Sequence, residues 1–365
     1  MTTRVTLKDV AARAGVSIST VSYALNDAST VQLAEETRAR VRRIADELGY
    51  LPNGMARALQ ARSSRAIGVV LTMPLTIPRY AAIVEGASAG LAARGFRLSV
   101  VADPTGQTYL DDCRSGLLDG LVFVGHDDES VPADMADAVR RHDIPFVALD
   151  CGSGGTSVPY STVDFDYPAG ARQMVEHLVA QGTRTLLYTR PDVAARSERL
   201  REAAVVAALT AHPDVTLHVV PTGLTDTPPE RQDRDPGAVL AERLDAALGQ
   251  VLRGRADASR TAVLCSWGPD SEHAYRVARR HDAGIEVAAL AAGPLDENAW
   301  PGLCCSRLPL QEAGRECARL VVAALDPDAG HEHVLLAPTL SGTAPTTEAA
   351  APAARSTRSD EGERP

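Results

Sequence analysis

The chain has 365 residues, of which 45% are hydrophobic and 23% are charged. This composition excludes a disordered chain, and the length suffices for a small domain and a larger one. No run of about 18 apolar residues without charge occurs, so we expect no membrane span. The first residues, MTTRVTLKDV, lack the apolar centre of a signal peptide, which predicts a cytoplasmic protein.

Acidic and basic side chains are distributed unevenly along the chain. It carries 37 Lys and Arg and 47 Asp and Glu, a net charge of −10. Residues 1–65 nevertheless hold ten basic and six acidic side chains, a net charge of +4, which leaves −14 for the rest. Because phosphates repel an acidic body, this pattern predicts that only the first 65 residues approach a polyanion such as nucleic acid.

The sequence lacks the spacings of metal ligands and of catalytic motifs. No G-x-S-x-G turn occurs, the stretch GSGGTS from Gly152 lacks the third glycine of a dinucleotide-binding turn, and His331 and His333 have no third ligand nearby. The cysteines form no C-x-x-C pair, which favours reduced, buried thiols. We therefore expect no metal, no cofactor and no enzyme activity. The six cysteines are Cys113, Cys151, Cys265, Cys304, Cys305 and Cys317.

Three short helices are predicted in the basic N-terminal region. Residues 6–14 carry apolar side chains at a spacing of three and four, with Thr6 as N-cap and Gly15 as the stop. Ser17 caps a second helix over residues 18–26, and residues 36–50 form a third with arginines outside. The second helix aligns a polar row made of Ser19, Ser22, Tyr23 and Asn26.

Helices of this length bury enough surface only when they pack together. A trihelical unit whose second helix shows small polar side chains outward has the geometry of a helix-turn-helix, in which that helix lies in the major groove. An ordinary solvated helix is the alternative interpretation of the same pattern.

The N-terminal segment also resembles a known family. TLKDVAARAGVSISTVSYALN, followed by TRARVRRIADELGYLPNGMARALQARSS, is similar to the head of LacI-type (LacI/GalR) bacterial transcription regulators, and weaker similarity continues to about residue 345. The resemblance favours the helix-turn-helix over the solvated helix. It implies a homodimeric regulator, with repressor as the favoured role, that binds double-stranded operator DNA and is controlled by a small-molecule effector.

The resemblance implies roles for single residues of the head. Ile18, Ser19 and Tyr23 would face base edges, where few side chains choose the sequence. Hydroxyls and amides elsewhere would hold phosphates and fix the register on DNA. These are Thr6, Ser17, Thr20, Ser22, Asn26 and Asn53.

Residues 51–65 are implied to become helical only when two subunits bind one operator. Leu59 matches the family residue that wedges into the minor groove, with Ala56 beside it. Gly54 and the short length make an isolated helix marginal, so the partner and the DNA must stabilise it. A flexible linker is the alternative when DNA is absent.

Two departures from the family pattern precede the third helix. The loop DASTVQLAEE is one or two residues longer than usual, and Ala34 stands where the family often has a serine cap. The weaker cap costs about 0.5 to 2 kcal/mol and loosens this helix without removing the DNA contacts.

Beyond residue 65 short apolar strands alternate with helices. Helical segments such as 80–95, 169–182, 238–252 and 272–281 separate most of the strands. This alternation predicts doubly wound parallel sheets, and about 275 residues is too many for one. We expect two, with a ligand in the crevice at the carboxyl ends of the strands. The strands are predicted at 67–71, 98–102, 120–124, 145–150, 185–189, 217–221, 262–266 and 286–290.

The resemblance implies the two-lobed fold of periplasmic sugar-binding proteins, with crossings between lobes near residues 163–166, 291–295 and 326–329. The predicted organisation is a small all-α helix-turn-helix head (1–50), a hinge (51–65) and a two-lobed α/β effector-binding and dimerisation domain (66–342). The tail, 343–365, has almost no large apolar residue and is predicted to be disordered, and the charged loop 221–237 to be mobile. Two heads held about one DNA turn apart also require a homodimer.

Effector contacts carry over by resemblance at Tyr80, Asp164 and Arg199. An aromatic face stacks on a sugar or base, and Asp and Arg bind hydroxyls or carboxylates. Arg199 has an alternative as a surface charge on a helix, and Asp164 has one as a turn or cap residue.

Other positions depart from the family's effector site. CSWGPD places Trp267 and Gly268 where the family shows Asn-Asp, and AAGPLDE replaces G-F-D-D. These losses fall where sugar hydroxyls are normally held, so we expect a less polar or aromatic effector stacked on Trp267, or no small effector. Trp267 as core filler is an equal alternative. A solute-binding receptor with the same body is opposed by the basic head and the missing signal peptide.

Overall fold

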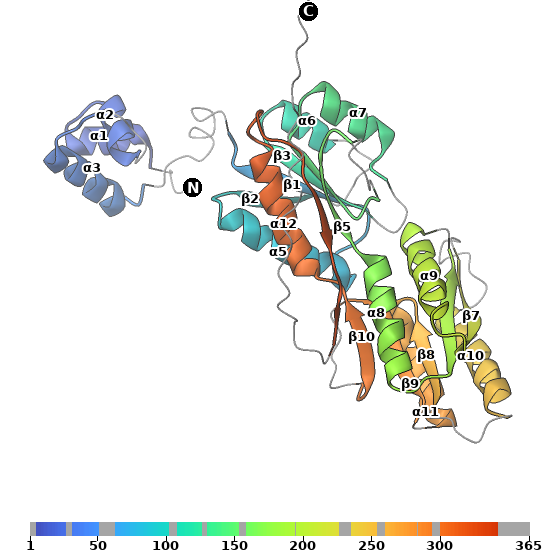
Figure 1. The fold of residues 1–365 in the computed structure, drawn as a ribbon. Helices are drawn as coiled ribbons and strands as arrows, with labels where there is room; N and C mark the ends of the chain where they lie inside the picture. Colours follow the sequence, from blue (N-terminus) through green and yellow to red (C-terminus); the bar gives the residue numbers. More distant parts are fainter. Residues whose placement is uncertain are drawn as a thin grey trace, which may run out of the picture. The chain divides into compact units, whose positions relative to one another are not determined.

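The computed structural model describes residues 5–26, 31–50, 63–101, 108–125, 130–152, 158–193, 195–225, 235–253, 260–282, 284–293 and 300–341. By its contacts the chain divides into two compact units, residues 1–66 with 111–119 and residues 67–110 with 120–365 (Figure 1). Each unit is described on its own.

The three predicted helices of the head are present as α1 (Leu7–Ala14), α2 (Ile18–Leu25) and α3 (Glu35–Glu47). Thr6 starts α1 with a capping box, in which the Thr6 amide donates to the Asp9 carboxylate at 2.8 Å and the Asp9 amide donates to the Thr6 hydroxyl. The Thr6 hydroxyl, which donates to the Asp9 carboxylate at 2.7 Å, and the Thr6 amide together lower the pKa of Asp9. Gly15 ends α1 in the left-handed region, with φ of 67°, which favours glycine.

One apolar cluster holds the three head helices together. Its buried members are Val10, Ala11, Ala14, Val21, Ala24, Val41, Ile44, Ala45 and Tyr50. Arg42 Nε on α3 also donates to the carbonyl of Ala24 at 3.3 Å, which ties α3 to the end of α2. The inner side of α2 is therefore fixed by packing, and its outer side carries the side chains that the core does not use.

The first lobe of the larger unit is built on a six-stranded sheet with the order β11-β5-β4-β3-β1-β2. The pairs β11–β5, β5–β4, β4–β3 and β3–β1 are parallel, and Val69 lies opposite Val122, which lies opposite Val147. The strands are β1 (Ala66–Leu71), β2 (Arg97–Val101), β3 (Gly120–Val124), β4 (Phe146–Leu149), β5 (Ser161–Phe165) and β11 (His333–Leu336). The helices of this lobe are α5 (Pro78–Ala92), α7 (Ala133–Arg141) and α12 (Leu310–Ala323), while α6 (Thr108–Arg114) spans the boundary between the two units at residue 111.

The second lobe has its own six-stranded sheet, with the order β12-β10-β9-β8-β6-β7. Its strands pair in parallel except β12, which runs antiparallel to β10. The strands are β6 (Thr185–Asp192), β7 (Thr216–Thr225), β8 (Thr261–Cys265), β9 (Glu286–Ala292), β10 (Leu303–Arg307) and β12 (Thr339–Leu340). The helices are α8 (Tyr167–Ala180), α9 (Arg196–Leu209), α10 (Pro236–Leu252) and α11 (Ser271–His281), which follows the short helix η3 (Gly268–Asp270).

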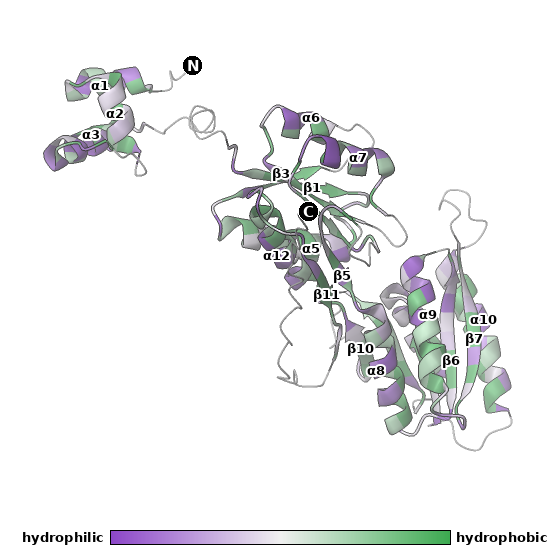
Figure 2. Ribbon diagram, turned by 45° about the horizontal axis from the view of Figure 1, so that its top comes forward, coloured by the Kyte–Doolittle hydropathy of each residue, from purple (hydrophilic) through white to green (hydrophobic). Residues whose placement is uncertain are grey.

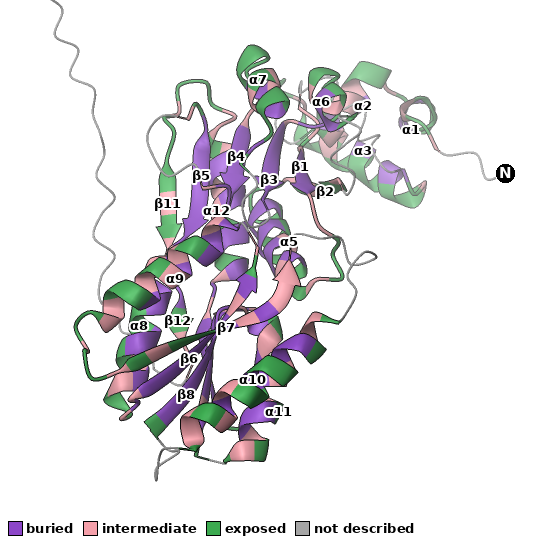
Figure 3. Ribbon diagram, turned by 90° about the vertical axis from the view of Figure 1, so that its right-hand side faces the viewer, coloured by how far each residue is buried: buried purple, intermediate pink, exposed green. Residues whose placement is uncertain are grey.

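Alternating side chains of the second sheet enter two separate cores. Leu186 and Leu264 pack with α8 and α9, whereas Leu187 and Val263 pack with α10 and α11. Successive residues of a strand point to opposite faces, so both faces of this sheet are covered by helices. The central strands are apolar in Figure 2 and buried in Figure 3. This arrangement confirms the predicted doubly wound sheets.

Two glycines let α5 and α12 pack closely on the first sheet. A Cβ atom on Gly86 would lie 2.0 Å from the carbonyl oxygen of Gln311, and one on Gly314 would lie 2.1 Å from the carbonyl oxygen of Ile83. Any larger residue at either position would force the two helices apart.

The chain crosses between the lobes three times, and two of these crossings lie later than predicted. The first follows β5, where it was expected. The second lies between β10 and α12, at residues 308–309, and the third between β11 and β12, at residues 337–338. The positions implied by the resemblance were too early, because the chain adds β10 to the second sheet and β11 to the first sheet before it crosses.

Within the described ranges no helix is long and apolar enough to cross a membrane, and no three potential ligand side chains are grouped around a common metal position. None of the six cysteines forms a disulfide, and four of them are buried. Residues 226–234 of the predicted mobile loop, and the predicted disordered tail, lie outside the described residues.

Candidate functional site

The outer side of α2 carries small hydroxyl groups and two large apolar side chains. Ile18 is 49% exposed and Tyr23 is 41% exposed, although apolar side chains of this size are usually covered. The Ser17 hydroxyl accepts from the Thr20 amide at 3.1 Å and lies 2.8 Å from the Ser19 hydroxyl. This side of α2 has the shape and chemistry needed to approach base edges and phosphates.

The predicted DNA contacts of the head are distributed as follows. Tyr23 and Ser22 follow buried Val21 on the outer side of the helix, and Asn26 ends α2 at an exposed position. Thr20 and Ser22 are partly buried. The exposed members are Thr6, Ser17, Ile18, Ser19, Tyr23 and Asn26. Asn53, Ala56 and Leu59 lie outside the described residues.

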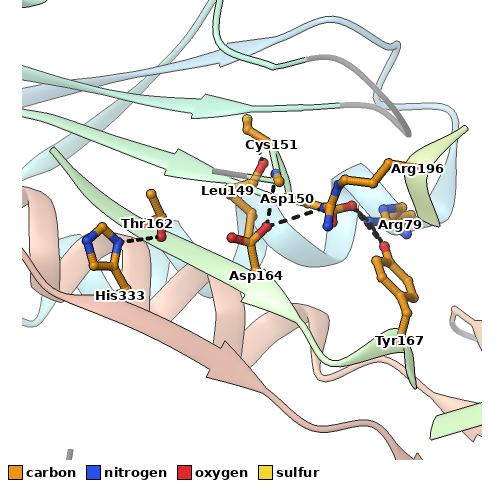
Figure 4. Close-up of polar contacts among 10 residues, drawn as sticks. Arg79, Leu149, Asp150, Cys151, Thr162, Asp164, Tyr167, Arg196 and His333 are labelled. Carbon is orange, nitrogen blue, oxygen red and sulfur yellow. Dashed lines mark hydrogen bonds and ion pairs between the residues drawn. The ribbon is translucent and has the colours of Figure 1, made fainter. Parts of the chain in front are cut away.

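A second group of polar side chains lies in the larger unit, at the carboxyl ends of the strands of the first sheet (Figure 4). Asp150 follows β4, and its carboxylate accepts from the Tyr167 hydroxyl at 2.9 Å and from Arg79. Arg79 Nη2 also lies 3.1 Å from the Tyr167 hydroxyl oxygen. Burial raises the pKa of Tyr167, so this hydroxyl is protonated and donates at neutral pH.

Arg196, at the start of α9, connects this group to the second lobe. Its Nη2 lies 3.2 Å from Asp150 Oδ1 and 3.4 Å from Asp164 Oδ1. Both carboxylates belong to the first lobe, so one guanidinium bridges the lobes. A Cβ atom on Gly152 would lie 2.3 Å from Arg196 Nε, which shows how closely this side chain is seated. The residues Arg79, Asp150, Asp164, Tyr167 and Arg196 are called the interlobe cluster below.

A buried carboxylate, Glu198, organises a neighbouring group in the second lobe. It accepts from Tyr188 at 2.8 Å, from Arg201 at 3.1 Å and from the indole of Trp267 at 3.0 Å, and also from Ser266. Glu198 and Arg201 are 2% and 3% exposed, so each compensates the other's charge away from water. We call Tyr188, Glu198, Arg201, Ser266 and Trp267 the Glu198 cluster.

Arg201 joins the two clusters. Its guanidinium carbon lies 5.2 Å from the ring centre of Tyr167 and 5.7 Å from that of Trp267. Cations are attracted to the faces of aromatic rings at such distances. The two clusters therefore form one continuous polar site between the lobes.

Three buried polar atoms near the carboxyl ends of the strands have no hydrogen-bond partner among the described residues. They are Thr72 Oγ1 after β1, Arg196 Nε, and Asp270 Oδ2 after β8. Burial, and secondarily Glu198, raises the pKa of Asp270 to about 7. Buried polar atoms are usually hydrogen-bonded, so these three are available to a bound molecule or to water.

The structure separates the four predicted effector residues. Asp164 belongs to the interlobe cluster and Trp267 to the Glu198 cluster. Tyr80 is fully buried in the apolar core of the first lobe, and Arg199 lies on the exposed side of α9. As effector contacts, Tyr80 and Arg199 stay predictions.

Arginines adjacent to these positions occupy the interlobe site instead. Arg79 precedes Tyr80, and Arg201 follows Arg199 by two residues, which turns the side chain by about 200° around the helix. Arg79, Asp150 and Glu198 were not predicted. The sequence could have indicated Asp150, because it directly follows the buried strand FVAL, and ligands bind at the carboxyl ends of such strands.

An exposed recognition helix on a three-helix head, in one chain with a two-lobed body, defines the class of helix-turn-helix transcription regulators. Residues 6–53 match the family model described as bacterial regulatory proteins, lacI family. The chain is 28% identical to the HTH-type transcriptional regulator CelR of Thermobifida fusca over 341 residues, which cover 87% of this chain and 91% of that protein.

Other relatives match over shorter stretches. The HTH-type transcriptional repressor PurR of Pectobacterium carotovorum is 31% identical over 185 residues, which cover 50% of this chain and 52% of that protein. The fold is similar to that of the lac repressor dimer solved with operator and an anti-inducer, with a TM-score of 0.70 and 23% identity over 93% of this chain and 98% of that one. Residues 6–53 thus match the lacI family, and the chain is a DNA-binding transcriptional regulator similar to these proteins.

Proposed function

We propose that this protein is a cytoplasmic repressor, without enzyme activity, that binds a two-fold operator as a homodimer. The observation that carries the proposal is the outer side of α2, where Ile18 and Tyr23 stay exposed beside a row of hydroxyls. Ile18 and Tyr23 would contact thymine methyls and base edges, and Ser19 would add a hydroxyl to them. Thr6, Ser17, Thr20, Ser22 and Asn26 would hold phosphates.

The other parts of the chain have matching roles in this proposal. Residues 1–50 form the DNA-binding domain, 51–65 the linker that carries Asn53, Ala56 and Leu59 to the DNA, and 66–342 the effector-binding and dimerisation domain. The acidic body keeps away from phosphates, so binding rests on the basic head.

Selection from a pool of random duplexes tests this function. The full-length protein is expected to enrich one sequence with two-fold symmetry. Tyr23→Ala should lower affinity for that duplex about 5- to 150-fold, because one base contact is worth about 1 to 3 kcal/mol. Tyr275→Ala is the control, since Tyr275 packs on Trp300 in the second lobe. Enrichment of no sequence would contradict the proposal.

A small effector is proposed to bind between the lobes, against Asp164, Trp267 and the arginines of the two clusters. The three buried atoms without partners support this site, because a ligand with hydroxyl or amino groups would satisfy them. Trp267 offers an aromatic surface beside them, which suits a sugar-like or aromatic molecule.

A regulator that ignores small molecules is the second candidate, and one observation favours it. The charged groups of the site already pair with one another, as Arg196 does with Asp150 and Asp164. Thermal-shift measurements with sugars, nucleosides and aromatic acids separate the two. A stabilising compound should lose its effect in Trp267→Ala and keep it in Trp300→Ala, whereas no shift with any compound supports the second candidate.

A further inference from the structure

The carboxylate of Asp119 accepts hydrogen bonds from the last residues of the linker, Ser63, Ser64 and Arg65. Asp119 Oδ1 accepts from the Ser64 amide at 2.7 Å and from the Ser64 hydroxyl at 2.8 Å. Oδ2 accepts from the Ser63 hydroxyl at 2.5 Å and from the Arg65 amide at 2.9 Å. Four donors from three consecutive residues therefore converge on one carboxylate, two on each oxygen.

The backbone beside this carboxylate is fixed as well. The Asp119 amide donates to the carbonyl of Ala66 at 2.8 Å, and Ala66 is the first residue of β1. Asp119 directly precedes β3, whose first residue, Gly120, pairs with Ile67 of β1. Asp119 and the residues that it contacts therefore directly precede two strands that pair with each other.

Arg65 shows that the turn depends on these contacts. Its φ is +49°, in the left-handed region that residues with a Cβ seldom adopt. Its amide donates both to Asp119 and to the Ser63 hydroxyl at 3.3 Å. Hydrogen bonds to a charged acceptor are stronger than those between neutral groups. The bond to the Asp119 carboxylate therefore stabilises a backbone conformation that Arg65 would otherwise seldom adopt.

We propose that Asp119 is a positioning residue for DNA binding, which clamps the last residues of the linker so that the two heads of a dimer reach the operator in one register. The proposal rests on the proposed function. Residues 63–65 are already fixed before DNA binds, so binding costs less conformational entropy there, and the clamp increases affinity for the specific site without touching DNA. It also connects the linker to β1 and β3, the strands that lead to the carboxyl edge of the first lobe.

Asp119→Asn replaces one of the two acceptor oxygens and so removes two of the four hydrogen bonds, because an amide nitrogen cannot accept a hydrogen bond. We expect affinity for the duplex selected by the wild type to fall about tenfold. Affinity for a scrambled duplex of equal length at low salt should stay within twofold, since it depends on the charge of the heads. If Asp119 only stabilised the fold, the substitution would lower the affinities for both duplexes equally, or would lower the melting temperature.

Asp111→Asn is the matched control, because Asp111 is an exposed carboxylate in the same segment, in a surface pair with Arg114. Ser64→Ala removes the hydroxyl donor and keeps the carboxylate, so its affinity for the selected duplex should fall about threefold. This variant tests the clamp even if Asp119→Asn fails to fold. The double variant should bind no more weakly than Asp119→Asn alone, as expected for residues that act through one contact.

Trypsin provides an independent measurement. Cleavage after Arg65 is expected to be several-fold faster in Asp119→Asn than in Asp111→Asn, because the turn opens. The inference is overturned if the wild type selects an operator and both Asp119→Asn and Ser64→Ala bind it as tightly. A wild type that selects no DNA would instead overturn the proposed function.

Discussion

Asp270 is a buried carboxyl group whose charge is not compensated by a nearby cation among the described residues. Its Oδ2 has no hydrogen-bond partner, and burial with the neighbouring charge of Glu198 raises its pKa to about 7. The unfolded chain loses this proton near pH 4, so between pH 4 and 7 the folded state holds more protons than the unfolded one. Stability must therefore fall as the pH rises through this window.

Asp270→Asn should remove this loss. We expect its free energy of unfolding to exceed that of the wild type by about 2 kcal/mol at pH 8, and by much less at pH 4.5. Urea unfolding at both pH values measures the difference. Glu272→Gln, on α11 directly after η3, is the control; Glu272 pairs with Arg276 and its substitution should show no such pH dependence. An equal effect of Asp270→Asn at both pH values would show that the carboxyl group ionises normally.

The effector candidates show what single residues reveal from sequence. Asp164 lies near the carboxyl end of β5 and Trp267 follows β8, where a doubly wound fold collects its functional groups, and the structure places both in the interlobe site. Arg199 and Tyr80 lie on helices, where a shift of one or two residues turns a side chain to another side. Apolar residues surround α9 without forming a clear stripe, so its sequence could not show that Arg196 and Arg201 point inward.

At the scale of elements, the start of α3 is the weak end of the head. The residue at its N-cap, Ala34, makes no side-chain hydrogen bond, whereas Thr6 and Ser17 cap α1 and α2. The amides in the first turn of α3 therefore lack the partner that a serine would supply.

Ala34→Ser is expected to stabilise α3 by about 1 kcal/mol, because Ala34 already has extended backbone angles that suit a cap. Hydrogen exchange of the α3 amides in the full chain measures this gain as slower exchange. Ser17→Ala should act in the opposite direction on α2. If Ala34→Ser leaves the α3 amides unchanged, the first turn of α3 does not limit the stability of the head.

The predicted elements were those with a strong local pattern. Buried strands such as VVL of β1 and VFV of β3 were evident because continuous apolar runs mark strands covered on both faces. β5, β10, β11 and β12 were missed because polar residues interrupt them or because they are short, and their pairing depends on distant parts of the chain.

At the scale of the whole molecule, Arg196 links the two lobes. Its guanidinium pairs with Asp150 and Asp164 of the first lobe, and its side chain is 23% exposed. Removing one partner of a largely buried ion pair is costly, because the remaining charges lose compensation. Arg196 is therefore one of the side chains that hold the lobes together, beside Tyr167 of α8, which donates to Asp150.

Arg196→Gln is expected to destabilise the protein by about 1 to 3 kcal/mol and to increase its radius of gyration as the lobes separate. Thermal unfolding and small-angle X-ray scattering provide the two measurements. Arg199→Gln, on the exposed side of the same helix, is the control. It should change the stability by no more than about 0.5 kcal/mol and leave the radius of gyration unchanged. Equal effects of both substitutions would show that the interlobe pair does not hold the lobes.

The central claim is that two copies of the head read one operator. Hydroxyl-radical footprinting on the selected duplex, with the mass of the complex measured by analytical ultracentrifugation, tests this most directly. Two protected half-sites about one helical turn apart, related by two-fold symmetry and covered by two chains, are the predicted result. A single protected site occupied by one chain would contradict the claim.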